Sequence, residues 1–453
     1  MNGERPVDRG IRRGARGFLC GEAKGRGTVT RDPDAKKGAV QMNRARQWQL
    51  GVLVAVFTGT LTGLGSGCKH QPPEAKTPPK VDARLVSANT AFGFKLLQKL
   101  VAEKPKENVF ISPVSISLAL AMTYNGAAGD TKAAMAKTMG VQGLSDDECY
   151  RANAALVSEL HKPAQTVDLS IASSLWVDQR FPVRQEFLTA NSGSHSTQVA
   201  NLDFATPNAA QAINGWVSEN TRGKIATMVT SHDLRDEAKL VLLNTAYFKA
   251  PWTRRFDASE TREAEFTLPD GGHKTVQMMS LDKELPYLKG SKFQAVQLDC
   301  GAGRFAMLVL LPDEGSDLGA LIASFGADQW QALLTGLKSE TGLLELPRFQ
   351  VEGDFGLKQS LSALGLGVAF AQDADFSGIT SHQPMYLSLA RHRSSLTVNE
   401  EGVEAGAATI LGGPPGMPRP AFRMIVDRPF LCAITDSATG TILFLGAIVD
   451  PKA

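Results

Sequence analysis

The stretch KLVLLNTAYFKAPW, Lys239–Trp252, is the most informative part of the sequence for the fold. Its apolar residues run almost without interruption, whereas a strand with one solvent-exposed face alternates apolar and polar residues. An apolar run of this kind is typical of a strand inside a sheet that is covered on both faces. We therefore expect residues 239–252 to form an inner strand of a covered sheet.

The segments that follow this run are rich in strands. Apolar or alternating runs between Gly, Asp and Lys turns indicate strands at residues 262–268, 274–279, 293–300, 304–312, 341–353, 421–434 and 440–450. Residues 319–337 and 357–367 have the apolar spacing of helices.

The segments that precede it are rich in helices. Helical spacing is found at residues 86–103, 112–127, 130–140, 146–162 and 208–224, and residues 167–178 are typical of a strand. Ser112 and Pro113 mark a helix start and Gly140 a helix end. Helices first and strands later, without strand–helix alternation, predict the α+β class. No repeat or linker divides residues 81–453, so one domain over residues 83–453 is expected.

The N-terminal region differs from the rest in charge and hydropathy. Residues 1–41 carry ten Lys and Arg but five acids, and lack apolar periodicity, so we expect a disordered or non-native leader before a true start at Met42. Residues 42–68, MNRARQWQLGVLVAVFTGTLTGLGSGC, have the basic, apolar and small-residue regions of an export signal. The terminal Cys68 resembles the lipid-modified cysteine of bacterial lipoproteins; a simple secretory signal and an uncleaved anchor are the alternatives. Residues 69–82 are a Pro-rich tether.

The remaining composition excludes several classes of function. The net charge is +2 for the whole chain and about −5 for residues 69–453, which argues against a nucleic-acid partner. No HExxH, GxSxG, GxxxxGK[ST] or GxGxxG motif occurs, and the seven His residues have no metal-ligand spacing. Cys300 and Cys432 lie in strand-like runs, where buried inert thiols are expected. A hydrolase whose triad is assembled only by folding stays an alternative.

Residues 400–420, EEGVEAGAATILGGPPGMPRP, contain almost no bulky side chains although they lie between apolar segments. As an inserted strand, this stretch would turn Val403, Ala405, Ala407 and Thr409 toward the interior, all of them small or β-branched. Glu404, Gly406, Ala408 and Ile410 would take the other face. Gly402 can serve as the hinge, because glycine tolerates a large φ/ψ change. A flexible Ala/Gly loop is the other interpretation of this segment alone.

Further segments, in order and widely spaced, carry a resemblance to a known family. They are residues 108–131 (NVFISPVSISLALAMTYNGAAGDT), 213–225 (INGWVSENTRGKI), 240–252 (LVLLNTAYFKAPW) and 426–451 (VDRPFLCAITDSATGTILFLGAIVDP). Together with the hinge they resemble the serpins along nearly all of residues 85–452. The resemblance implies the serpin fold, with helices, three β-sheets and an exposed reactive-centre loop.

The resemblance implies a suicide-substrate inhibitor of serine endopeptidases, with cysteine proteases as an alternative target class. The protease attacks the exposed loop and forms an acyl-enzyme, and the cleaved loop then inserts into the main sheet and distorts the trapped enzyme. An inward charge or proline in the loop would oppose insertion. Residues 403–411 contain neither on the inward face.

The resemblance also assigns individual residues. The shutter, a hydrogen-bonded cluster beneath the point where the sheet opens, corresponds to Ser112, Ser115, Asn244 and His392. Trp252 corresponds to the breach, where insertion begins. The loop hinge corresponds to Glu400, Glu401, Gly402, Val403, Glu404, Ala405, Gly406, Ala407, Ala408 and Thr409.

The scissile bond is less sharply defined by the sequence. The usual distance from Gly402 gives Gly416–Met417, and counting back from Pro429 gives a position nearer residue 418. Met417 and Arg419 are each followed by proline, which blocks most serine proteases after the scissile bond. We therefore predict cleavage at Gly416–Met417, with Arg419 as the alternative specificity residue and an elastase-, subtilisin- or chymotrypsin-like target.

The expected partners follow from these predictions. The target protease is the main partner, and the membrane is contacted only through the lipid anchor. We expect a monomer that is exported and either held at the cell envelope or extracellular. No cofactor or metal is implied, and Lys132, Lys137 and Lys162 are too sparse for a polyanion site. The alternative function is that of a non-inhibitory serpin acting as a carrier, chaperone or structural protein.

Overall fold

The computed structural model describes residues 81–452, except 163, 165, 192–196, 236–237 and 404–420. Its centre is a long sheet with strand order β10, β11, β4, β2, β3. The bounds of these strands are Phe349–Gly356, Leu387–Val398, Leu240–Pro251, Asp168–Asp178 and Thr197–Leu202. The apolar run that opened the sequence analysis is the central strand β4, and all but two of its residues are buried.

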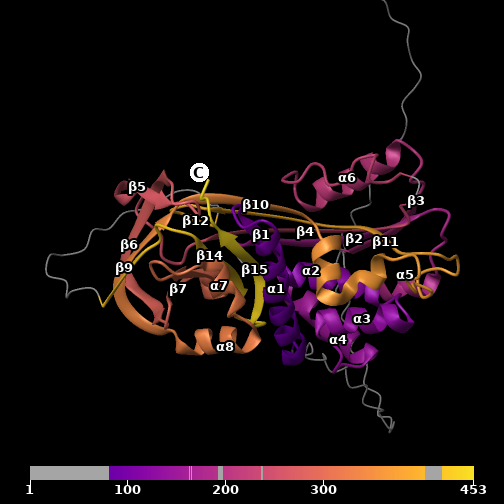
Figure 1. Ribbon diagram of the computed structural model, residues 1–453, viewed down its shortest axis with the longest axis horizontal. Helices are drawn as coiled ribbons and strands as arrows, with labels where there is room; N and C mark the ends of the chain where they lie inside the picture. Colours follow the sequence, from indigo (N-terminus) through magenta and orange to yellow (C-terminus); the bar gives the residue numbers. More distant parts are fainter. Residues whose placement is uncertain are drawn as a thin grey trace, which may run out of the picture. The chain divides into compact units, whose positions relative to one another are not determined.

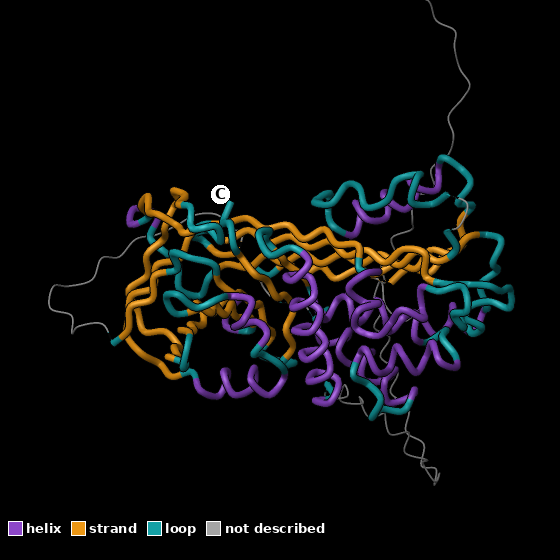
Figure 2. The backbone as a smooth tube through the Cα atoms, in the orientation of Figure 1, coloured by secondary structure: helices purple, strands orange, loops and turns teal. Residues whose placement is uncertain are grey.

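Helices cover both faces of this sheet (Figure 1). One face packs on a helical layer of α1 (Ala83–Glu103), α2 (Pro113–Tyr124), α3 (Gly129–Met139), α4 (Asp146–Leu160) and α5 (Gln185–Asn191). The other face is covered by α6 (Asn208–Asn220), where Ile213 and Val217 join Trp176, Val241 and Leu243 in a separate small core. Figure 2 shows the long strands between these two layers. Cover on both faces explains why β4 lacks polar alternation.

The sixth strand of this sheet is β12 (Gly402–Val403), which pairs with β4, and the other described strands form a nine-stranded network in two parts. One part holds β5 (Arg262–Thr267), β6 (His273–Lys289), β9 (Lys338–Pro347) and β13 (Phe422–Ile425). The other holds β7, β8, β14, β15 and β1, with bounds Phe293–Cys300, Phe305–Pro312, Phe430–Asp436, Thr441–Ile448 and Val109–Ile111. The two parts join because the end of β6, from Tyr287 to Lys289, pairs with β7. The described strands thus form two hydrogen-bonded sheets, and the expected three sheets are obtained only when the nine-stranded network is divided into its two parts.

Two predicted helices are interrupted. Residues 319–337 form α7 (Leu318–Ala323) and α8 (Ala327–Gly336), with a break before Gly326. Residues 357–367 form α9 (Lys358–Leu361) and a π-turn over Ser362–Leu366, followed by a 3₁₀ turn over Gly367–Phe370. Gly365, within the π-turn, has φ of 106°, a value outside the helical range. Short 3₁₀ turns also occur at Ala258–Glu260 and Gly301–Gly303.

The expected helix ends and buried thiols are found. α2 starts at Pro113 after Ser112, and α3 ends at Gly140, whose φ is 73°. Cys300 and Cys432 are fully buried and unpaired, and burial raises the pKa of each thiol to about 12. Thiols of this kind are inert packing groups at neutral pH.

Candidate functional site

The junction between the neighbouring strands β4 and β11 of the six-stranded sheet is where the chain enters residues 400–420, the loop segment. β11 runs parallel to β4 up to the Ser395–Tyr247 pair. The chain then turns, and β12 (Gly402–Val403) pairs antiparallel with Pro251 and Ala250 of β4. On its other side Gly402 accepts a backbone hydrogen bond from Asn399, at 3.1 Å. The first hinge residues thus already lie as a short strand between β4 and the end of β11.

Gly402 lies very close to the β4 backbone. A Cβ at this position would be 2.4 Å from the Ala250 carbonyl oxygen and 2.5 Å from the Pro251 Cα. Its φ is not among the positive values found for glycines of the described residues. Steric contact with β4, rather than an unusual backbone angle, therefore requires glycine here in this conformation. The freedom of glycine in φ and ψ, on which the prediction of a hinge at Gly402 rests, matters only when this segment moves.

The turn before β12 is held by Asn399 and Trp252. The Asn399 side-chain oxygen accepts from the backbone N–H groups of Glu401 and Gly402, at 3.1 and 3.3 Å. The indole Nε1–H of Trp252 donates to the Asn399 carbonyl at 2.8 Å, and the Trp252 backbone N–H donates to the Glu401 carbonyl at 3.1 Å. The predicted breach residue thus contacts the base of the loop segment directly. Sequence reasoning did not identify Asn399.

Glu400 is buried at the same turn and is paired with Arg348. The Arg348 guanidinium donates to both carboxylate oxygens of Glu400 at 2.7 Å, and the Thr261 hydroxyl donates at 2.5 Å. Burial raises the pKa of Glu400, but the hydrogen bonds from Arg348 and Thr261 outweigh it and leave this pKa below its ordinary value. Glu400 is therefore charged at neutral pH and links the loop base to Thr261, just before β5, and to Arg348, between β9 and β10.

Arg348→Met is expected to lower the free energy of unfolding by about 2 kcal/mol. Removing Arg348 leaves the buried Glu400 carboxylate without its charged partner, and the effect is smaller than for a fully buried pair because Arg348 is itself partly exposed. Urea unfolding followed by circular dichroism measures the change. Adding Glu400→Gln should recover part of the loss. A double variant less stable than Arg348→Met alone would contradict the pairing argument.

The four predicted shutter residues form one buried cluster beneath β4 and β11. The Asn244 side-chain amide donates to the Ser115 hydroxyl at 2.6 Å and to the Ser173 hydroxyl at 3.0 Å. Its oxygen lies 2.6 Å from Nδ1 of His392. The backbone N–H of Ser112 donates to His392 Nε2 at 3.0 Å. The cluster thus links β4, β11 and β2 to the start of α2.

The tautomer of His392 follows from its partners. Because Nε2 accepts from a backbone N–H, the proton of the neutral ring must be on Nδ1, which then donates to Asn244. Both ring nitrogens are occupied, so this side chain is not placed as a catalytic base. Burial lowers the pKa of His392 to about 3. A protonated ring would direct a second donor at the Ser112 N–H.

Stability is expected to fall on mild acidification because of His392. The unfolded chain binds a proton near pH 6.5, whereas the folded protein does not bind it until about pH 3. The stability is therefore complete above pH 6.5 and decreases as the pH falls toward 3. Glu400 and the other carboxylates with lowered pKa lose their contribution to stability only below about pH 4.5, outside this window. We expect a loss of about 2 kcal/mol between pH 6.5 and 5.

Urea unfolding at pH 7, 6.5, 5.5 and 5 measures this loss. The His392→Asn variant should be less stable but lose the pH dependence in this window. The matched variant His273→Gln removes an exposed histidine and should keep the dependence. An unchanged pH dependence in His392→Asn would contradict the assignment.

Comparison with known proteins identifies the family. The family described as "Serpin (serine protease inhibitor)" matches residues 87–451. The chain belongs to the serpin family. It is 34% identical over 381 residues to a leukocyte elastase inhibitor of Bos taurus, covering 81% of this chain and 100% of that protein. It is 32% identical to Iripin-1 of Ixodes ricinus, covering 81% of this chain and 94% of that protein.

Solved structures show the same fold. Human thyroxine-binding globulin has a TM-score of 0.75 and 28% identity, covering 82% of this chain and 99% of that chain. The thermophilic serpin Tengpin has a TM-score of 0.76 and 26% identity, covering 83% of this chain and 96% of that chain. This chain has the serpin fold, with helices and several β-sheets around a central sheet.

The structure locates the described site residues and leaves others outside its range. Glu400–Val403 and Trp252 meet at the end of β4, and the shutter cluster lies further along the same strand. Residues 404–409, Gly416, Met417, Arg419 and Cys68 lie outside the described residues. Sequence reasoning missed Arg348, Thr261 and Ser173, and also Ser394, whose hydroxyl donates to the Phe110 carbonyl at 2.7 Å. Ser394 could have been found, because it follows His392 by two residues on the same face of β11.

The described residues, which are 81–452 without the gaps given above, contain neither a metal site nor a membrane-spanning helix. No group of His, Cys, Asp or Glu residues there is arranged to hold a metal ion. Within the same part of the chain, no helix is long and apolar enough to span a membrane.

Proposed function

We propose that this serpin is a suicide-substrate inhibitor of serine endopeptidases, with cysteine proteases as the alternative target class. The observation that carries the proposal is β12: the first two hinge residues already pair with β4 at the end of the β4–β11 junction. Continuing this strand would place small residues of the loop between β4 and β11. The inserted loop would then form ladder hydrogen bonds with β4 on one side and with β11 on the other. In the present structure β4 and β11 form these hydrogen bonds with each other.

The proposed mechanism uses the loop as substrate and the sheet as trap. A protease attacks the loop and forms an acyl-enzyme, and the freed hinge extends from Val403 into the junction. β4 and β11 must separate for this, so the shutter contacts between Asn244 and His392 must break. The new strand is buried, which makes insertion favourable and carries the acylated protease along the sheet.

The target that we propose is elastase-, subtilisin- or chymotrypsin-like, with cleavage at Gly416–Met417. Pro418 and Pro420 disfavour cleavage after Met417 and Arg419, and the curated relatives include proteins named leukocyte elastase inhibitors. We propose Arg419 as the alternative specificity residue. A single protein chain is sufficient for this mechanism, and we propose a monomer.

Incubation with proteases followed by denaturing gels tests the proposal. Elastase, subtilisin, chymotrypsin and trypsin should be compared at equal activity. A complex that survives SDS with at least one of them is the expected result, and mass spectrometry of the released peptide identifies the cleaved bond. Clean loop cleavage without a complex would favour the alternative, a non-inhibitory carrier or structural serpin. That alternative has some support, because a protein named for thyroxine binding shares the fold.

We further propose that residues 42–68 direct export and that Cys68 carries a lipid. The support is the sequence of this segment alone: a basic start, an apolar stretch and small residues before the cysteine. Expression in bacteria with radiolabelled palmitate should label the protein, and Cys68→Ser should abolish the label. Export without label would favour a simple secretory signal.

A further inference from the structure

Lys239, the residue before β4, links the two strands that would separate on insertion. Its carbonyl accepts a hydrogen bond from the Asp178 N–H of β2 at 2.9 Å, so its backbone belongs to the β4–β2 side of the junction. Its own N–H donates to the Ser388 hydroxyl of β11 at 2.8 Å, and its Nζ donates to the Pro384 carbonyl, just before β11, at 2.9 Å. Lys239 therefore joins β4 to β11 at the end of the junction that is farthest from the hinge.

Two aromatic rings lie beside the ammonium group of Lys239. Nζ is 4.6 Å from the centre of the buried Tyr386 ring and 5.5 Å from the centre of the Phe181 ring. Phe181 follows β2 and Tyr386 directly precedes β11, so the two rings come from opposite sides of the junction. A cation over an aromatic face is attracted to it, and more strongly where water is excluded. The charge of Lys239, and not only its backbone, thus holds the two sides together.

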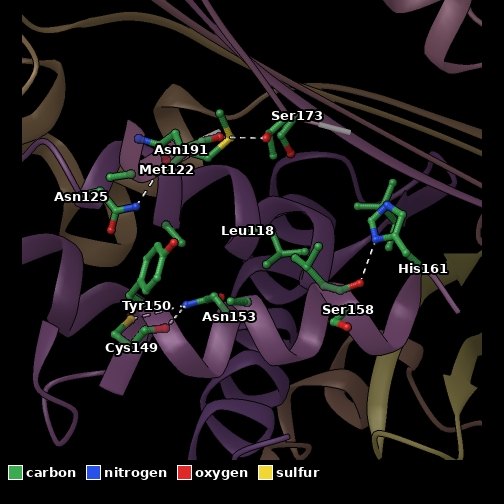
Figure 3. Close-up of a pocket in the computed structure, with 16 residues that line it drawn as sticks. Leu118, Met122, Asn125, Cys149, Tyr150, Asn153, Ser158, His161, Ser173 and Asn191 are labelled. Carbon is green, nitrogen blue, oxygen red and sulfur yellow. Dashed lines mark hydrogen bonds between the residues drawn. The ribbon is translucent and has the colours of Figure 1, made fainter. Parts of the chain in front are cut away.

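The far-end tie consists of Lys239 with its partners Phe181, Pro384, Tyr386 and Ser388. It is separate from the breach contact of Trp252 at the hinge end and from the shutter contact of Asn244 in the middle of β4. Ser173, a partner in the shutter, faces the helical layer, where Met122 and Asn191 lie (Figure 3). The far-end tie lies beyond this packed region, where β4 begins.

The register of β12 predicts how far the loop can extend along β4. Gly402 pairs with Pro251, and each following residue would pair one position further back along β4. Gly413 would therefore reach Leu240, the first residue of β4. Pro414 comes next, and proline has no N–H to extend the ladder. The strand that can be inserted thus ends at Gly413, beside the far-end tie.

We propose that Lys239 is a positioning residue that keeps the far end of the β4–β11 junction closed until insertion is almost complete. This inference rests on the proposed function, because the far-end tie has to break only when a strand enters the whole junction. A strand that ends at the shutter leaves it intact. A strand that extends to Gly413 must move Lys239 and Pro384 apart by about 4.8 Å, which breaks the Nζ hydrogen bond. The far-end tie therefore sets the rate of the last part of insertion.

Two peptides with the sequence of the loop test the inference on the intact protein. The long peptide, EAGAATILGG, copies residues 404–413 and would reach Leu240. The short peptide, EAGAAT, copies residues 404–409 and would end opposite Asn244. Each peptide carries an N-terminal fluorescein, and native gels give the rate at which the protein incorporates it. Only the long peptide has to break the far-end tie.

Lys239→Met should speed incorporation of the long peptide at least fivefold and that of the short peptide less than twofold. Methionine keeps an apolar chain between the rings but removes the charge and the Nζ hydrogen bond. Lys239→Arg keeps the charge and should stay within about twofold of the wild-type rates. Phe181→Leu changes a partly exposed residue outside the strands, so it is expected to fold even if Lys239→Met does not, and should speed the long peptide at least twofold. Lys132→Met is the matched control: it removes a cation–π contact with Tyr124 in the helical layer and should change neither rate.

Equal rates of long-peptide incorporation in wild type, Lys239→Met and Phe181→Leu would overturn the inference. An equal acceleration of both peptides would also overturn it, because a general loss of stability has that effect. If the wild-type protein incorporates neither peptide, the proposed insertion is overturned and the inference with it. The two failures are distinguishable, because unchanged rates in the variants are measured only when the wild-type protein incorporates the peptides.

Discussion

Ala407→Arg is expected to convert the protein from an inhibitor into a substrate. Val403 is fully buried and belongs to the core between the sheet and the helices. Because side chains alternate along a strand, residue 407 of an extended β12 would face the same core. An arginine there would be an unpaired charge in an apolar interior and would oppose insertion by several kcal/mol. The loop would then be cleaved and released before the acyl-enzyme is trapped.

The ratio of SDS-stable complex to cleaved inhibitor measures this effect. We expect the ratio to fall at least tenfold in Ala407→Arg, with little change in the rate of loop cleavage. Glu404→Arg is the matched control: residue 404 would face the opposite side, beside the partly exposed Lys249 of β4, and already carries a charge, so this variant should keep most of the complex. Equal losses in both variants would show that the alternation argument is wrong.

Asn244→Ala is expected to lower the free energy of unfolding by about 4 kcal/mol. The side chain of Asn244 is buried and bonds to His392, Ser115 and Ser173. Alanine leaves a cavity and removes the partner of the Nδ1–H group of His392. Buried polar networks of this kind lose more than one bond when a shared member is removed.

Urea unfolding followed by circular dichroism at pH 7 measures this loss. Asn220→Ala is the control: the side chain of Asn220 donates to the Trp216 carbonyl at 2.9 Å on the α6 helix, and the expected change is below about 1 kcal/mol. A similar small change in Asn244→Ala would contradict the importance of the cluster. The pH dependence predicted for His392 should persist in Asn244→Ala, because burial of the ring, and not its bond to Asn244, lowers the pKa of His392.

The fold could be predicted where a short segment carries its own signal. The apolar run at β4 predicts an inner strand, and the helical spacing before it predicts the α1–α4 layer. The break between α7 and α8 was missed, because the apolar spacing continues across Gly326 while the backbone turns. The pairing of the end of β6 with β7 was missed for a different reason: strand pairing depends on tertiary contacts, which the sequence of a single segment does not show.

The candidate site could be predicted in part. The shutter residues came from the resemblance, and the structure brings them together. The pairing of Glu400 with Arg348 could not be predicted, because the two residues are 52 positions apart and meet only after β9 and β12 are placed. The requirement for glycine at residue 402 has the same origin, since its close neighbours are the Ala250 and Pro251 backbone atoms.

A crystal structure of the loop-cleaved protein tests the central claim most directly. The account predicts that the Asn244–His392 contact is broken and that residues from Val403 onward form a new strand between β4 and β11. Val403, Ala405 and Ala407 should face the helical layer, and Glu404 should face the other side. A cleaved protein in which β4 and β11 stay paired from Leu240–Leu387 to Tyr247–Ser395 would contradict the account.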